Sequence, residues 1–363
     1  MTETMPMEIE KNLAALRYLD DERILWGTET TAHNVPPEGV AALIGISGVF
    51  YFSHKRTSAD AVAYCMNDYL ARVQPKLKLS HFSGRAYRKM RSEPFNFTGR
   101  QIMEHNERKR SCAFAFATTS AEKSHYPGHY TLLTTYFEQP PDSIHFCFPI
   151  GFLLEQRPGY LHEMVADWAD HLQPYHGTVG LGTILPTYFT TARSTGGAIY
   201  PYLQRFPGLQ PDYPVWFSVK LFDGILGVNW YTMVSDELLE RIGGREAVAA
   251  QLDERFFLWD YPEGLGIMAG RLPELGDSEQ GLMPDLYVKL HSVLRPLYSQ
   301  KIRGIAECLP LGVSTEAFDK EWMYRFDGMG YSEKPLPCSK CRSAAEIRES
   351  FEDVYSALEA KIR

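Results

Sequence analysis

Long apolar runs, a secretion signal and a dense set of cysteines are all missing from this sequence of 363 residues. The longest apolar run, Val40–Phe52, is too short to span a bilayer as a helix. The first residues include acids where a secretory signal would carry basic residues and then an apolar segment. The six cysteines are scattered, which indicates reduced thiols rather than a disulfide framework. We therefore expect a cytoplasmic protein.

Complete catalytic and metal-binding motifs are also missing. Cys338 and Cys341 have the spacing of a metal-ligand pair, but no second pair follows, so their role stays open. His162-Glu163 lacks the second histidine of a zinc-protease helix. The glycine-rich stretch 176–182 follows a predicted helix, whereas a phosphate-binding loop precedes one. We expect no catalytic residue, no metal and no cofactor.

Two strand–helix–strand patterns organise the chain. In the first, the apolar run Leu43–Phe52 predicts a strand, and helical spacing of apolar residues predicts a helix over Ser58–Val73. In the second, Ile144–Leu154 predicts a strand, and Gly159–Leu172 predicts a helix with Glu163, Asp167, Asp170 and His171 facing water. A glycine-punctuated strand, Gly177–Leu185, completes the second pattern. We interpret the two as copies of one β-α-β module.

The rest of the chain extends this pattern with shorter elements. We expect an N-terminal helix, a loop-rich basic segment over 83–110, and a second loop over 186–214. A serine N-cap and a glycine stop predict a helix over Ser235–Gly244. Further strands are predicted at 111–118, 130–137, 215–222, 225–231, 256–259 and 266–270, and further helices at 284–297 and 344–362.

The predicted fold class is therefore α+β. We expect two fused halves built from duplicated β-α-β modules with mixed or antiparallel sheets, packed as one body. The boundaries are an N-terminal helix and loop (1–42), a first half (43–190), a second half (191–310), and a C-terminal loop and helix (311–363). A chain of 363 residues with 44% hydrophobic residues can bury a core of this size.

Charge is distributed unevenly, although the formal net charge is only −8. The segment Lys76–Lys123 is rich in lysine and arginine. The segment Asp253–Asp285 contains acids at positions 253, 254, 260, 263, 274, 277, 279 and 285, against Arg255 and Arg271 alone. An acidic balance disfavours non-specific DNA binding and favours a basic protein partner.

Several linked motifs between about Leu43 and Leu297 resemble one bacterial family. They are Arg157-Pro158-Gly159, the glycine-rich stretch 176–180, Phe206–Leu209 followed by Asp212, the run 227–232, and Asp236-Glu237 with Gly243-Gly244. The family consists of type VI secretion immunity proteins associated with VRR-Nuc and related restriction-fold nuclease effectors. The resemblance implies a protein that binds a secreted toxin and acts without catalysis.

A nuclease toxin implies a particular kind of partner surface. Nuclease clefts are basic because phosphate contacts dominate their affinity for DNA, so an acidic surface can occupy such a cleft. We expect contact with the toxin through the acidic segment or through the loop Phe206–Asp223, and no direct contact with nucleic acid or membrane. A metal-dependent hydrolase and a structural or scaffolding component of the secretion system stay open as alternatives. The candidate residues are Asp212, Tyr213, Asp223, Asp260, Glu263, Glu274, Asp277 and Glu279.

Overall fold

A single eleven-stranded sheet runs through the described part of the chain, and every neighbouring pair of its strands is antiparallel. The strand order is β10-β11-β9-β8-β2-β7-β6-β5-β3-β4, with β1 paired to β2. This computed structural model describes residues 19, 22–26, 39–82, 85–90, 95–108, 114–136, 141–156, 159–211, 223–300, 308–310 and 312–328.

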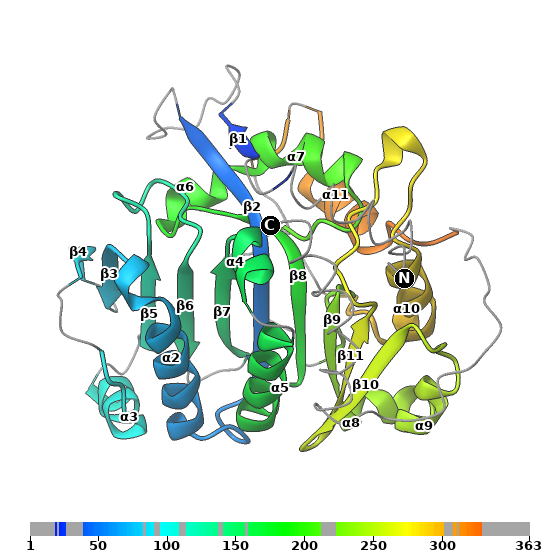
Figure 1. Ribbon diagram of the computed structural model, residues 1–363, viewed down its shortest axis with the longest axis horizontal. Coiled ribbons are helices and arrows are strands. Elements are labelled where there is room, and N and C mark those ends of the chain that lie inside the picture. Colours follow the sequence, from blue (N-terminus) through cyan, green and yellow to red (C-terminus); the bar gives the residue numbers. More distant parts are fainter. Residues whose placement is uncertain are drawn as a thin grey trace, which may run out of the picture.

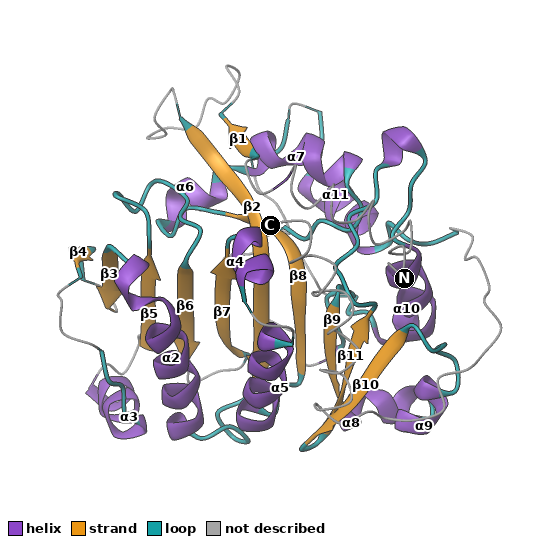
Figure 2. Cartoon of the chain, viewed as in Figure 1, coloured by secondary structure: helices purple, strands orange, loops and turns teal. Residues whose placement is uncertain are grey.

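Groups of strands and groups of helices follow one another along the chain (Figures 1 and 2). The strands are β1 (Arg23–Leu25), β2 (Val40–Phe52), β3 (Leu79–Phe82), β4 (Arg88–Lys89), β5 (Phe114–Thr119), β6 (Thr131–Tyr136), β7 (Asp142–Phe148), β8 (His176–Ile184), β9 (Tyr231–Ser235), β10 (Phe256–Tyr261) and β11 (Gly264–Ala269). The α-helices are α2 (Ala59–Val73), α3 (Gly99–Arg108), α4 (Ile150–Glu155), α5 (Tyr160–Leu172), α6 (Phe189–Arg193), α7 (Gly196–Arg205), α8 (Asp236–Leu239), α9 (Gly244–Ala249), α10 (Asp285–Leu294) and α11 (Thr315–Met323). Short 3-10 turns are η1 (Gln74–Lys76), η4 (Glu240–Ile242), η5 (Ser278–Gln280) and η6 (Arg295–Leu297).

The two long helices in front of the sheet follow the predicted pattern. Helix α2 begins after Ser58, whose side chain accepts a hydrogen bond from the Ala61 amide. Helix α5 ends at Gln173, which adopts a left-handed conformation before Pro174 and so cannot continue the helix. Figure 1 shows both helices crossing the same face of the sheet, where α2 packs on β6 and α5 on β2 and β10. Their apolar faces cover the sheet.

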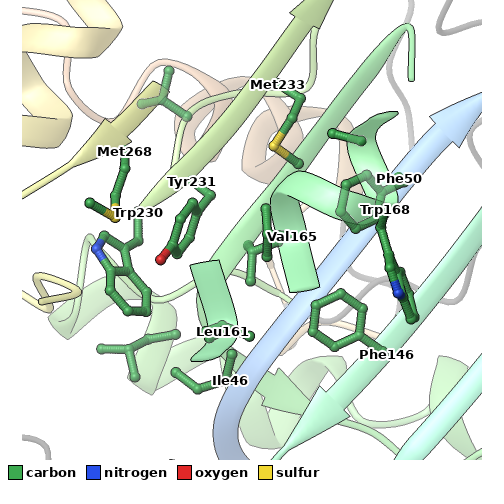
Figure 3. Packing of buried hydrophobic residues seen from close by; sticks show 14 of the residues in the cluster. Ile46, Phe50, Phe146, Leu161, Val165, Trp168, Trp230, Tyr231, Met233 and Met268 are labelled. Carbon is green, nitrogen blue, oxygen red and sulfur yellow. The ribbon is translucent and has the colours of Figure 1, made fainter. Parts of the chain in front are cut away.

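The core lies between these helices and the central strands (Figure 3). Trp168 of α5 is fully buried, and its ring packs against Phe50 of β2 and Phe146 of β7. Removing such a ring costs roughly 3–5 kcal/mol, because the cavity left behind adds to the lost burial. Strand β2 is buried along nearly its whole length, which explains its continuous apolar sequence.

The fold class is confirmed, but duplication of a β-α-β module is not. The first unit, β2-α2-β3, places three strands between its two ends, whereas the second, β7-α5-β8, places only β2 between them. The strands β8 and β9 pair with each other, so one sheet includes strands from both predicted halves. The proposed division at 42, 190 and 310 stays a prediction.

Several local predictions were wrong. Residues 150–154 form helix α4, because Pro149 has no amide hydrogen to donate to the strand ladder and stands at the helix N-cap. The predicted strand 225–231 is not formed; Ile225 makes only an isolated bridge to Tyr298, and the strand begins at Tyr231. The two segments predicted as loops contain helices α3, α6 and α7, and residues 23–25, expected to be helical, form β1.

Other local predictions were confirmed or fall outside the described part. Strands β2, β8, β10 and β11 and helix α10 lie where the sequence placed them, with shifts at their ends. Ser235 is at the N-cap position of α8, and Gly243 adopts the left-handed conformation expected of a glycine stop. The predicted strand 215–222, the predicted helix 344–362, and Cys338 and Cys341 lie outside the described residues.

Candidate partner-binding surface

Four acidic side chains meet where the turn between β10 and β11 lies beside the start of α8. Strand β11 pairs with β9, and this pairing places the end of β9 next to the turn. The Asp236 amide donates to the Glu263 carbonyl oxygen at 2.8 Å, which fixes the two segments together. We call Asp236, Glu237, Asp260 and Glu263, with their partners Arg56 and Arg245, the hairpin-end cluster.

Two arginines hold the four acids of this cluster. Arg245 Nε donates to Asp236 Oδ1 at 2.6 Å, and another of its amino groups bonds Asp260. This pairing raises the pKa of the Arg245 guanidinium, chiefly through the hydrogen bond to Asp236. Arg56 lies 2.7 Å from Glu237 Oε2 and 3.4 Å from Glu263 Oε2. With four acids against two arginines, the cluster retains an excess of negative charge.

Exposure decides whether a partner could reach these carboxylates. The side chains of Glu237, Asp260 and Glu263 are 52%, 55% and 57% exposed, so more than half of each is open to solvent. Glu263 also has a positive φ of 63°, the left-handed conformation that the tight turn requires. The cluster is therefore an accessible, acid-rich surface whose side chains are oriented by arginine.

The acids at 277 and 279 lie at the opposite end of the sheet, near α7 (Figure 1, where residues 278–280 are yellow). Arg205 donates hydrogen bonds to both carboxylate oxygens of Asp277, and the bond from Nη2 to Oδ2 is 2.8 Å long. Arg205 also lies 3.1 Å from the carboxylate of Glu279. The arginine holds the pKa of the Asp277 carboxyl below its usual range. Asp277 also accepts a hydrogen bond from the Glu279 amide, so it shapes this turn.

Two further candidates have structural partners. Glu274 is buried, and its Oε2 accepts a hydrogen bond from the Leu286 amide in the first turn of α10. Asp223 Oδ1 accepts a hydrogen bond from Ser299 Oγ at 3.1 Å. The remaining candidates, Asp212 and Tyr213, lie outside the described residues.

The predicted acidic segment thus divides into three parts with different environments. The structure brings Asp260 and Glu263 together, and it places Asp277 and Glu279 elsewhere and Glu274 in the interior. Asp236 and Glu237 join the first group, although the sequence placed them at the start of a helix and in a family motif and did not mark them as candidate contact residues. The two acids in the first turn of α8 can be read from the sequence, but only the pairing of β9 with β11 shows that the turn with Asp260 and Glu263 lies beside them.

Histidines are the remaining groups that could bind metal or move protons. His162 is buried between Tyr231 and Trp259, and burial lowers its pKa to about 4. His176 Nδ1 donates to the Met233 carbonyl at 3.0 Å, and burial again lowers the pKa to about 4. Within the described ranges, no group of three or more His, Cys, Asp or Glu side chains could hold a metal ion. No helix in the described part of the chain has the length and apolarity to cross a bilayer.

The model of the TsiV family, described as type VI immunity for VRR-NUC, matches residues 61–326. The chain belongs to the TsiV family. The match includes most of α2, all of α5 and β8, and the four acids of the hairpin-end cluster. No curated protein matches the chain significantly.

A solved structure confirms that this TsiV-family chain has a known fold. The Pseudomonas aeruginosa T6SS protein PA0821 superposes with a TM-score of 0.71 at 20% sequence identity. The match covers 87% of this chain and 91% of that one. At this identity the likeness concerns the fold, and the family assignment rests on the match over 61–326.

Proposed function

We propose that this chain neutralises a VRR-Nuc effector of a type VI secretion system by covering the surface through which the nuclease holds DNA. The family match over residues 61–326 carries this proposal. A nuclease must present basic side chains to phosphates, and these are the groups that an acid-rich surface attracts. Neutralisation then needs only tight binding and no covalent chemistry.

The hairpin-end cluster is the surface that we assign to the effector. Its excess negative charge would speed the encounter with a basic groove, and such steering raises association rates by roughly 10- to 1,000-fold. Arg56 and Arg245 already hold the carboxylates in place, so less side-chain freedom is lost on binding. Acids held in this way can present a fixed pattern of charge to the partner.

The first experiment is co-expression of the chain with a cognate VRR-Nuc effector. We expect cells that express the effector to survive only when this chain is also present, and the two proteins to co-purify. Co-purification without protection would favour a scaffolding role. Turnover of a small substrate that depends on a bound metal would favour the alternative of a hydrolase.

A charge-reversal pair then tests the surface. The triple variant Glu237→Lys, Asp260→Lys, Glu263→Lys should slow association with the effector by roughly 10- to 100-fold at low salt, with a smaller effect at high salt. The matched control, Glu254→Lys, Glu279→Lys, Glu316→Lys, reverses three exposed acids elsewhere and changes the net charge equally. Equal slowing by both triples would show that only total charge matters, and it would rule out the hairpin-end cluster as the contact surface.

A further inference from the structure

A cleft of about 740 Å³ lies on the other side of the molecule from the hairpin-end cluster, among α7, η5, η6 and α11. Its volume is within the range of known ligand sites, roughly 300–1,000 Å³. Apolar side chains make up much of its wall, including Leu203, Pro207, Met283 and Trp322. Charged side chains from α11 and the turn after it complete the lining. The cleft therefore combines an apolar wall with charge.

Arg325 is the unusual group in this cleft. Its guanidinium carbon lies 3.9 Å from the centre of the Trp322 ring and 4.3 Å from that of Phe326. Nε donates to the Pro207 carbonyl at 2.7 Å, and Nη1 donates to the Trp322 carbonyl at 2.9 Å. Arginine has five N–H donors, so most of them remain without a protein acceptor in the described part. No carboxylate among the described residues pairs with it.

The electrostatic environment of Arg325 is opposite to that of Arg245 and Arg295. Desolvation lowers the pKa of its guanidinium to about 10, whereas acidic partners raise the pKa of Arg245 and Arg295. Arg325 is half-buried, and a positive charge with restricted access to water and no counter-ion among the described residues is unfavourable. A bound anion would relieve this cost, so the site is arranged for a negatively charged group.

The acids that line the cleft are engaged with other residues. Asp327 accepts hydrogen bonds from Arg295 Nε at 2.8 Å and from His291 Nε2 at 2.6 Å. These bonds, the one from Arg295 first, lower the pKa of Asp327 to about 2. Glu321 accepts a long hydrogen bond from Gln204 at 3.4 Å. With Lys320, the cleft has three cationic side chains against these two acids.

We infer that this cleft binds an acidic peptide segment of a protein partner, with a carboxylate on Arg325 and flanking apolar side chains against Leu203, Met283 and Trp322. The planar fork of arginine matches the two oxygens of a carboxylate. The apolar wall favours a peptide over a bare phosphate, which would leave that wall exposed to water. This site goes beyond the blocking of a nuclease and stands without it.

The indole of Trp322 provides a direct reporter. Its Nε1 is buried and has no hydrogen-bond partner in the described part, and the ring stacks on Arg325. The full-length protein labelled with ¹⁵N would be titrated with acetyl-Phe-Asp-Phe-amide and, separately, with acetyl-Phe-Asn-Phe-amide. The chain has six tryptophans, and Trp322→Phe identifies the relevant signal. We expect a saturable shift of that signal, with the aspartyl peptide binding about 10-fold more tightly, a difference of about 1.4 kcal/mol.

Two variants and one competing anion complete the test. Arg325→Gln should remove the preference for aspartate over asparagine, whereas Arg255→Gln, at an arginine paired with Asp253, should keep it. The two peptides can be compared on the unmodified protein, so a folding defect in a variant would leave the test intact. An equal response to inorganic phosphate, equal binding of both peptides, or no response because the chain's own residues fill the cleft would overturn the proposal.

Discussion

Arginine side chains at the two ends of the sheet have opposite electrostatic surroundings. At the hairpin-end cluster, Arg56 and Arg245 each contact two acids, and the acids are in excess. In the cleft, Arg325 bonds only carbonyl oxygens and aromatic faces within the described chain. The first end has an excess of negative charge, and the cleft contains a cation without an acidic partner in the described chain. One molecule can thus present two surfaces of opposite preference.

Lowering the pH should have the largest effect, because it destabilises the scaffold that keeps the two ends apart. His162 and His176 have pKa values of about 4 in the folded protein, against 6.5 for an exposed histidine. The unfolded chain therefore binds more protons between these values, and stability falls as the pH drops from about 6.5 to about 4. The expected loss is about 3 kcal/mol for each histidine across this window.

The measurement is urea denaturation at a series of pH values. His162→Phe should flatten the pH dependence by about the share of one histidine, because it removes one of the two titrating groups. The fold should tolerate the change, since the two ring nitrogens of His162 have no partners in the described chain. The neighbours Tyr231 and Trp259 already provide an aromatic environment. An unchanged pH dependence in this variant would show that His162 is not kept neutral by the fold.

An intermediate effect on stability should distinguish the buried Glu274 from the exposed Glu279 within the acidic segment Asp253–Asp285. Glu274→Ala leaves the buried Leu286 amide without its acceptor, so we expect a loss of about 2 kcal/mol in unfolding free energy. Glu279→Ala, at an exposed position only five residues later, should stay within about 0.5 kcal/mol. Chemical denaturation of both variants checks this. Similar losses would mean that the segment acts as one unit.

The smallest expected change in stability concerns the contrast between Arg245 and Arg325. Arg245→Met should cost about 1 kcal/mol at low salt and less at high salt, since it leaves two partly exposed acids without their cation. Arg325→Met should change stability by less than about 1 kcal/mol at either salt concentration, because the hydrogen bonds it loses are offset by removing a desolvated charge. Denaturation at two salt concentrations distinguishes them. The same salt dependence for both would indicate a counter-ion at Arg325.

Sequence patterns predicted the elements that are both regular and amphipathic. Helices α2 and α5 bury their apolar stripes at the expected positions, and β2 and β8 are buried along nearly their whole length. Helix α7 could not be predicted in this way, because it begins with two glycines and contains Pro201. It forms because Ile199 and Leu203 are buried where the helix packs on β1 and β2, a tertiary contact that outweighs weak local propensity.

The candidate sites, too, could be predicted only in part, because their residues come from distant positions in the sequence. Sequence identified Asp260 and Glu263 as members of an acidic segment, but their partners come from distant positions: Arg56 precedes α2, and Arg245 lies in α9. Nothing in the sequence around Arg325 indicates a missing counter-ion, since Asp327 is only two residues away. Asp327 pairs instead with Arg295 and His291, and only the folded structure shows this choice.

The central position of β2 also has a consequence for the timing of folding. The first residues of this strand pair with β1, but most of its length pairs with β7 and β8: Phe52 pairs with Asp142, and Leu43 with Ile184. A nascent chain must therefore hold most of a long apolar strand unpaired until its middle part has been synthesised, and closing such distant pairs is slow. For a member of an immunity family, readiness before an attack would depend on a stock of already folded molecules.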